Sequence, residues 1–394
     1  MKRVLFITPD SLKSVNGGSV LFREVLRSFK PGFIRWFNCS ESPEKTILDY
    51  IFYNSNYYNS FFFRLYFLNA LSRRFWLIGI PFFSIKYKLI SYFCYKKAVK
   101  TIVNEKVNHL WIYAYHFSIP VCRKIHQKLN IQFHLSVQDD IHTHLPAFES
   151  MMLEKDFRYL FENASSFDFV SEEMEKYYRE KYNFKGAAMT LMMCQRTEST
   201  LPKAASEIRK IGFAGNIWCI ENFIILLEAL EELDCKYSIL ITLDIFTNGN
   251  PVRHFEKFRK YINIYPAIKY EDLVLKLQQC DLLYLPMSFM PEKEVTSITS
   301  FPSKLLLYMN SAVPVLNHSP EYAASHKFVI KNMIGISVTS EGKDAIVDLF
   351  TQGKEKLNIN HRLRYSENAS SALEKFDNKD MINRFVNLIS ANAD

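Results

Sequence analysis

Short apolar runs alternate along the chain with stretches whose apolar residues recur at helical spacing. Runs such as 4–8 and 133–137 end in polar turns, as is typical of strands buried on both faces of a parallel sheet. The alternation predicts β-α units wound around a parallel sheet, an α/β fold. In the first half, strands are expected at 4–8, 33–38, 110–115, 133–137, 167–170 and 187–192, and helices at 20–29, 119–129, 151–163 and 172–182.

A polar stretch between Gln195 and Glu207 interrupts this pattern, and Pro202 lies within it. We place a domain boundary there and expect an N-terminal domain over residues 1–195 and a C-terminal domain over 208–376. The 394 residues are enough for two such cores. A second series follows, with strands at 208–214, 237–243, 262–265, 282–285, 313–316 and 334–338, and helices at 221–233, 253–261, 270–279 and 302–310.

The last 18 residues, 377–394, are expected to form a closing helix, because the apolar residues of 380–390 share one helical face. The composition, 48% hydrophobic and 23% charged, excludes a disordered chain and a multi-span membrane protein. No apolar stretch approaches the ~20 residues that span a bilayer. Seven scattered cysteines without C-x-x-C spacing indicate a reducing compartment and no zinc or redox site.

Basic and aromatic residues crowd one segment of the first half, residues 50–106. Nine basic residues and one acid, Glu105, lie between Arg64 and Lys106. This combination predicts contact with an anionic membrane surface. The alternative is that a compositional bias toward aromatics simply fills helices of the first domain. Nucleic acid is not expected as a partner, because no recognition motif accompanies the charge.

Two helix starts offer candidate anion sites. Gly17 and Gly18 precede the helix expected at 20–29, and glycines there let a ligand approach the backbone amides. Ser303 and Lys304 follow Pro302, which suits a first helical turn, and place a hydroxyl and a cation beside free amides. A diphosphate would bind such a group. A plain turn and an ordinary capped helix are the respective structural alternatives.

The run at 300–316 resembles the S-K-L-x-E-Y-[ML]-x-x-G-x-P-V signature of GT-B glycosyltransferases, particularly the retaining enzymes of family 4 that use nucleotide sugars. The likeness extends through the segments at 169–174, 213–216, 270–273 and 280–286, in the family order. It implies GT-B architecture, with two doubly wound Rossmann-like domains facing across a cleft. It also implies a nucleotide sugar as co-substrate, no further cofactor and no active-site metal.

The chain departs from the family at its donor site. The two glutamates of the E-x7-E pattern fall on Thr299 and Leu307, and Leu307 cannot accept hydrogen bonds from a ribose. Glu292 and Glu294 lie upstream and are left open as substitutes. The family arginine after the first glycine of domain two is replaced by Asn216.

Two further family positions also differ. Glu221 and Asn222 stand near the place of a later lysine, and Ala312 replaces a glycine. Donor contacts are therefore expected from Asn216, Ser303, Lys304 and the backbone near Thr299, with Gly17 and Gly18 on the facing edge.

The segment at 136–144 follows a strand and resembles the V-H-D segment of the family cleft, with Gln138 in the histidine position and Asp139 in the aspartate position. Asp139 is the expected catalytic carboxylate, able to accept or orient a hydroxyl proton. His116 matches another cleft position, and a turn histidine bonded to backbone is its alternative. The Asp and His residues of the segment could also bind a divalent metal.

These features together predict a glycosyltransferase, hexosyl-type and retaining by resemblance, acting on a surface glycan or its lipid-linked precursor. We expect a cytoplasmic enzyme, peripheral on the inner face of the cell membrane. A catalytically degenerate scaffold or glycan-binding protein is the alternative that the missing glutamates favour. A nucleotide-sugar epimerase of the same architecture is less favoured, because no suitable carboxylate set is found.

Overall fold

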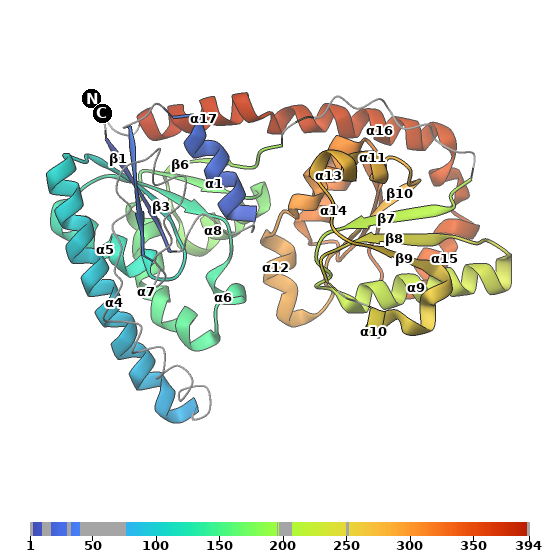
Figure 1. Ribbon diagram of the computed structural model, residues 1–394, viewed down its shortest axis with the longest axis horizontal. Coiled ribbons are helices and arrows are strands. Elements are labelled where there is room, and N and C mark those ends of the chain that lie inside the picture. The colour runs from blue at the N-terminus through green and yellow to red at the C-terminus, as the bar shows by residue number, and fades with distance from the viewer. Residues whose placement is uncertain are drawn as a thin grey trace. The chain divides into compact units, whose positions relative to one another are not determined.

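The structure is a computed structural model, and it describes residues 3–9, 17–29, 33–39, 76–194, 196, 207–249 and 252–391. The chain forms two compact units, Met1–Met192 with Ile382–Asp394, and Met193–Met381. Each unit contains one six-stranded parallel sheet (Figure 1). Most of the expected boundary segment, 195–207, lies outside the described residues. The last helix, α17 (Asn378–Ala391), begins in the second unit and ends in the first.

The sheet of the first unit has the order β2-β1-β3-β4-β5-β6. Strands such as β1 and β4 are short and buried throughout because helices cover both faces, which explains their continuous apolar runs, whereas the edge strand β6 is partly exposed. The strands span Val4–Thr8 (β1), Ile34–Asn38 (β2), His109–Tyr113 (β3), Phe133–Val137 (β4), Ser166–Phe169 (β5) and Ala187–Thr190 (β6).

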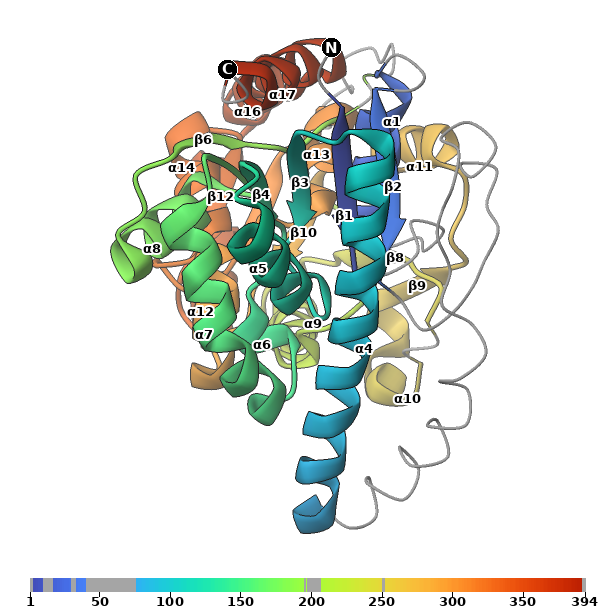
Figure 2. The ribbon, with the colours of Figure 1, turned by 90° about the vertical axis from the view of Figure 1, so that its left-hand side faces the viewer.

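Helices α4 (Trp76–Glu105), α5 (Ser118–Leu129) and α7 (Ala147–Asn163) lie side by side, with α5 in the middle (Figure 2). Helix α1 (Gly17–Arg27) and α17 contribute rings to Trp111 of β3. The ring centroids of Phe22 and Phe385 lie 5.6 and 4.8 Å from that of Trp111. The short α6 (Ile141–His144) and α8 (Glu172–Tyr182) complete the unit.

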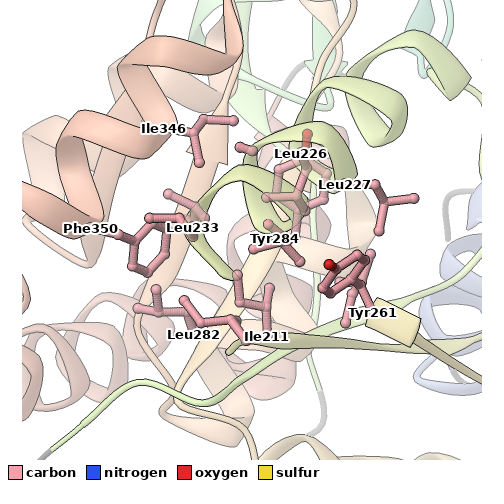
Figure 3. Packing of buried hydrophobic residues seen from close by; sticks show 14 of the residues in the cluster. Ile211, Leu226, Leu227, Leu233, Tyr261, Leu282, Tyr284, Ile346 and Phe350 are labelled. Atoms are coloured by element: carbon pink, nitrogen blue, oxygen red, sulfur yellow. The ribbon is translucent and has the colours of Figure 1, made fainter. Parts of the chain in front are cut away.

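The sheet of the second unit has the order β12-β11-β10-β7-β8-β9. A cluster of buried residues packs α9 and α15 against it, with Ile211 and Leu282 from the strands facing Leu226 and Ile346 from the helices (Figure 3). Its strands span Lys210–Ala214 (β7), Thr242–Phe246 (β8), Ile262–Tyr265 (β9), Leu282–Pro286 (β10), Val315–His318 (β11) and Gly335–Val338 (β12).

The longer helices of this unit are α9 (Ile220–Tyr237), α11 (Tyr270–Leu277), α13 (Ser303–Ser311), α14 (Ala324–Asn332), α15 (Lys343–Thr351) and α16 (Ile359–Leu373). Short helices include α10 (Val252–Phe255) and α12 (Glu294–Thr299), and 3-10 turns span Glu256–Tyr261, Pro291–Lys293, Lys354–Leu357 and Glu374–Phe376.

The strand orders locate the ligand-binding edges of both sheets. Chain order reverses between β1 and β3 in the first sheet and between β7 and β10 in the second. In doubly wound sheets, ligands bind beyond the carboxyl ends of the strands at such a reversal. The loops after these four strands are therefore where a site is expected.

The predicted fold, two doubly wound parallel sheets, is confirmed. One strand was placed too early: Tyr237 ends α9, and Ser238 has a φ of 56°, which stops the helix before β8. Helix α4 was not predicted, because apolar residues stand on both its buried side, as Tyr87 and Ile90 do, and its exposed side, as Ile85 and Leu89 do. No helix in the described part of the chain is long and apolar enough to cross a membrane.

Candidate functional site

The reversal point of the second sheet carries a glycine and a lysine that lie close together. Gly215 follows β7 with a φ of 109°, a conformation that residues with a side chain rarely adopt. A Cβ built on it would lie 3.6 Å from Cε and 3.9 Å from Nζ of Lys304. Because Gly215 has no side chain, the backbone at the end of β7 can be approached by a ligand next to Lys304.

Tyr308 anchors helix α13 to the sheet and so positions Lys304 one helical turn earlier. The Tyr308 hydroxyl donates to the backbone oxygen of Tyr284, at 3.0 Å, and accepts from the backbone N–H of Ala214, at 3.2 Å. Residues four apart share a helix face, so Lys304 points toward the same strand ends. Its ammonium lies over the ring of Phe213, 4.4 Å from the centroid.

Lys304 carries a charge that the described residues leave uncompensated. The side chain is half-buried, and burial lowers the pKa of Lys304 to about 8, with a smaller opposing effect from Cys219. None of the carboxylates in the described ranges lies within ion-pair distance of its Nζ. A desolvated cation beside an open backbone and a helix start is suited to bind an anion.

A carboxylate, that of Glu221, lies at the same carboxyl-terminal edge of the second sheet. Glu221, in the first turn of α9, accepts a hydrogen bond from Ser288 Oγ, with 2.6 Å between the oxygens. The buried Cys219 lies within electrostatic range of both Glu221 and Lys304, and burial raises the pKa of its thiol to about 12. Glu221 raises the pKa of this thiol further, while Lys304 and Lys293 lower it. Glu221, Lys304 and Lys293 therefore all lie within electrostatic range of the Cys219 sulfur.

The other residues predicted for the donor site differ in exposure. Asn216, next to Gly215, and Ser303, the first residue of α13, are both exposed. Thr299, the last residue of α12, is buried, and its hydroxyl donates to the backbone oxygen of Val295 at 2.8 Å. Leu307 is buried, 9% exposed, as a packing residue. The structure thus brings Asn216, Ser303 and Lys304 to one edge, whereas the Thr299 hydroxyl binds its own helix.

Glu292 and Glu294 were considered as substitutes for the family glutamates, and both are exposed. Glu292 lies in the 3-10 turn before α12, and Glu294 is the first residue of α12. Glycines Gly17 and Gly18 are the first residues of α1, which begins three residues earlier than expected. The loop between β1 and Gly17 lies outside the described residues.

Asp139 lies just beyond β4 and is half open to solvent. Its two carboxylate oxygens face different partners: Tyr113 donates its hydroxyl to one at 3.3 Å, and His144 Nε2 lies 3.7 Å from the other. The side chain of Asp139 is 43% exposed, so a substrate can reach it. Its neighbour Asp140 instead accepts from the backbone of α6 and from the Tyr178 hydroxyl.

His116 follows β3 at the same edge of the sheet, with a φ of 51°. Its Nε2 lies 3.4 Å from Glu149, a buried carboxylate of α7, and its ring stacks on Phe117 with centroids 4.9 Å apart. The left-handed backbone of a non-glycine residue is uncommon and is found at functional sites. His116 and Asp139 thus both follow adjacent strands of the first sheet.

A buried polar network joins β4 and β5 next to Asp139. The Asp168 carboxylate, fully buried on β5, accepts from Ser136 Oγ and lies 2.8 Å from His134 Nε2. Its other oxygen accepts from Gln138 Nε2 at 2.8 Å. A carboxylate offers only acceptors, so the Gln138 nitrogen must face it, and the Gln138 carbonyl oxygen faces the other way. Asp168 thereby orients the residue that precedes Asp139.

Several groups at these edges escaped sequence analysis, namely Tyr113, Glu149, Asp168 and Ser288. Ser288 follows β10 and Tyr113 ends β3, so the rule that ligands bind after strands could have found both. Glu149 and Asp168 carry no such signal, because nothing local distinguishes a buried acid from a surface acid. The described residues contain no group of three or more His, Cys, Asp or Glu side chains placed to hold a metal ion.

Comparison with solved structures supports the architecture. Sucrose-phosphate synthase from Thermosynechococcus elongatus superposes with a TM-score of 0.65 at 10% identity, covering 99% of both chains. HepE from Anabaena in complex with UDP and glucose gives 0.64 at 12% identity, covering 99% of this chain and 100% of that one. WaaG, a glycosyltransferase involved in lipopolysaccharide biosynthesis, gives 0.59 at 11%, covering 98% and 99%.

These likenesses extend over the whole chain and confirm the resemblance to the GT-B glycosyltransferase fold. At such low identity they concern the fold alone. Protein-family models and curated protein sequences gave no match.

Proposed function

We propose that this protein is a glycosyltransferase that moves a sugar from a nucleotide-diphosphate donor to a hydroxyl group. The observation that carries the proposal is Lys304, a half-buried cation with no carboxylate partner among the described residues, at the reversal point of the second sheet. The diphosphate of a nucleotide sugar supplies the missing negative charge. The solved neighbour HepE, which binds UDP and glucose, supports the same ligand class.

The chemistry follows from where negative charge develops. When the bond from the sugar to the diphosphate breaks, the leaving oxygen gains charge, and a fixed cation stabilises it. Lys304, the backbone at Gly215 and the first N–H groups of α13 are the groups proposed for this role, with Asn216 and Ser303 as donor contacts. On the first unit, Asp139 and His116 are proposed to orient or deprotonate hydroxyls of the reacting sugars.

The finer assignments rest on the sequence resemblance. By that resemblance the transfer is hexosyl-type and retaining, and needs neither metal nor further cofactor. Because Leu307 has replaced a glutamate, the ribose must be bound by other groups. The acceptor is proposed to be a surface glycan or its lipid-linked precursor, and the enzyme to act on the cytoplasmic face of the cell membrane.

Helix α4 supports a membrane-bound acceptor. Its exposed apolar residues include Ile85, Leu89 and Tyr92, with exposed fractions of 56%, 40% and 46%. Lysines are interspersed with them on the solvent side, namely Lys88, Lys96 and Lys100. The only acid of the helix, Glu105, lies within 4 Å of Arg3 and Arg35. A mixed apolar and cationic surface of this type binds anionic lipid; Arg64, Arg73 and Arg74 lie outside the described residues.

A screen of nucleoside diphosphates and nucleotide sugars tests the function, with thermal shift for binding and donor hydrolysis for turnover. A ligand at about 100 times its Kd stabilises the folded protein by ~2.7 kcal/mol, which shifts the melting temperature of a domain of this size by several degrees. Binding together with hydrolysis supports the transferase. No shift with any nucleotide at millimolar concentration would favour the degenerate scaffold instead.

A further inference from the structure

Glu221 occupies an unusual position for an acid in a site that binds a diphosphate. It lies in the first turn of α9, directly after the loop that carries Gly215 and Asn216. The end of β7 and the end of β10 meet here at the reversal point of the sheet. Its carboxylate therefore stands at the ligand-binding edge and not on a distant surface.

The carboxylate is held in place by a buried hydroxyl. Ser288, 1% exposed, donates to Glu221 at 2.6 Å and accepts from the backbone N–H of Met290 at 3.2 Å. The backbone oxygen of Ser288 in turn accepts from Ser297 Oγ at 3.0 Å. Both the β7 and the β10 loop thus fix the position of one carboxylate oxygen.

Glu221 is not neutralised by a neighbour. No cation in the described ranges lies within ion-pair distance of it, although Lys304 and Lys293 act on the same thiol of Cys219. The edge therefore carries a positive and a negative group that are separately anchored and near each other. Lys304 and Glu221 both act on the one buried sulfur of Cys219, so both charges stand at the edge where a diphosphate is proposed to bind.

We propose that Glu221 restricts the donor to nucleotide sugars whose sugar carries no negative charge, and that its carboxylate accepts a hydrogen bond from a hydroxyl of that sugar. This inference rests on the proposed function and names its substrate class. A carboxylate attracts hydroxyl donors, which neutral hexoses offer in number. A uronic acid at the same place would put two like charges together in a partly desolvated site, which strongly disfavours binding.

The test compares donors that differ only at carbon 6, UDP-glucose with UDP-glucuronate, or GDP-mannose with GDP-mannuronate if the protein prefers guanine. Isothermal titration is performed on the full chain and on Glu221→Gln, which keeps the shape and removes the charge. We expect the wild type to favour the neutral donor by at least about tenfold in Kd, and the variant to lose most of that preference. UDP or GDP alone should bind both proteins.

Two control variants separate a specificity role from a structural role. Glu367→Gln removes the same charge from an exposed position on α16 and should leave the preference unchanged. Ser288→Ala keeps the charge of Glu221 but removes the hydrogen bond that holds its carboxylate. It should therefore reduce the preference for the neutral donor by less than Glu221→Gln does. Equal binding of both donors by the wild type, or an unchanged ratio in a folded Glu221→Gln protein, would overturn the proposal. Failure of every nucleotide to bind the wild type would instead reject the glycosyltransferase assignment itself.

Discussion

The ammonium of Lys304 lies 4.4 Å from the centre of the Phe213 ring, at the end of the strand that forms the reversal point of the second sheet. The ring face is electron-rich and offsets part of the lost hydration of the cation. It cannot neutralise the charge, so the pKa of Lys304 remains below its ordinary value. This pair therefore keeps a cation desolvated and available for an anion, at some expense to the stability of the unliganded protein.

Replacing Lys304 with methionine should separate stability from binding. Methionine fills the space of the lysine chain without the buried charge, so the unliganded protein is expected to gain on the order of 1 kcal/mol. The same variant should lose the thermal shift caused by nucleotides. Differential scanning calorimetry with and without UDP or GDP measures both effects. A destabilised variant that still binds nucleotide would show that Lys304 is a packing residue.

The pH dependence of donor binding gives an independent check. Because the pKa of Lys304 is lowered to about 8, the side chain is charged below that pH and neutral above it. Affinity for a nucleotide sugar should therefore fall between pH 7 and pH 9, and Lys304→Arg, which stays charged, should remove this dependence. A bound diphosphate raises the pKa of Lys304, so the decline in affinity starts near pH 8, where the free protein loses the proton, and continues until the pH exceeds the raised pKa of the complex.

The sign for stability is the opposite. The unfolded chain keeps the lysine proton up to its ordinary pKa of about 10.4, whereas the folded unliganded protein loses it near 8. Between these values the unfolded state binds more protons, so this group contributes a stability that rises with pH. As the pH rises through this window, donor affinity measured by titration calorimetry should fall. The contribution of Lys304 to the free energy of unfolding, measured by chemical denaturation, should rise.

Much of this site follows from local sequence signals. Pro302 marks a helix start, so Ser303 and Lys304 could be placed in the first turn of a helix without a structure. The contact of Glu221 with Ser288 could not, because 67 residues separate them and each lies in an unremarkable loop. A donor contact was expected from the backbone near Thr299; the Thr299 hydroxyl itself donates to the backbone oxygen of Val295, one turn back in α12.

Helix α4 shows a different reason for failure. Amphipathic helices are recognised by an apolar stripe, but α4 buries Tyr87, Ile90 and Cys94 while leaving Ile85 and Leu89 exposed. Apolar residues on both sides erase the helical period. The feature that obscured the helix is the same feature that supports its contact with lipid.

Binding of the full chain to anionic vesicles tests that contact. Each lysine near such a surface contributes roughly 1 kcal/mol, and salt screens it over about 10 Å at 0.1 M. The double change of Lys96 and Lys100 to Gln should therefore lower co-sedimentation with anionic vesicles by at least about tenfold and weaken its salt dependence. Lys257 and Lys276, in the other unit, supply a matched double change to Gln that should have no effect. Equal sedimentation with neutral vesicles would contradict an electrostatic contact.

Asp139 and Asp140 are adjacent acids with different surroundings, which makes them a natural pair for testing catalysis. Asp139 is 43% exposed and faces Tyr113 and His144, whereas Asp140 is buried and caps α6. Asp139→Asn should leave folding and donor binding nearly intact and lower turnover by on the order of 10²-fold, the usual scale for a positioned proton-transfer group. Single-turnover kinetics with saturating donor measures the chemical step.

Asp140→Asn should behave in the reverse manner. It weakens a helix cap and the hydrogen bond from the buried Tyr178 hydroxyl, so it is expected to destabilise the protein by about 1–2 kcal/mol. Turnover of the remaining folded protein should stay within a few-fold of wild type, because Asp140 has no open side toward a substrate. If Asp139→Asn retains full activity, or if both variants lose activity only in proportion to their unfolded fraction, Asp139 has no catalytic role and the proton must be handled by another group at the ends of β3 and β4.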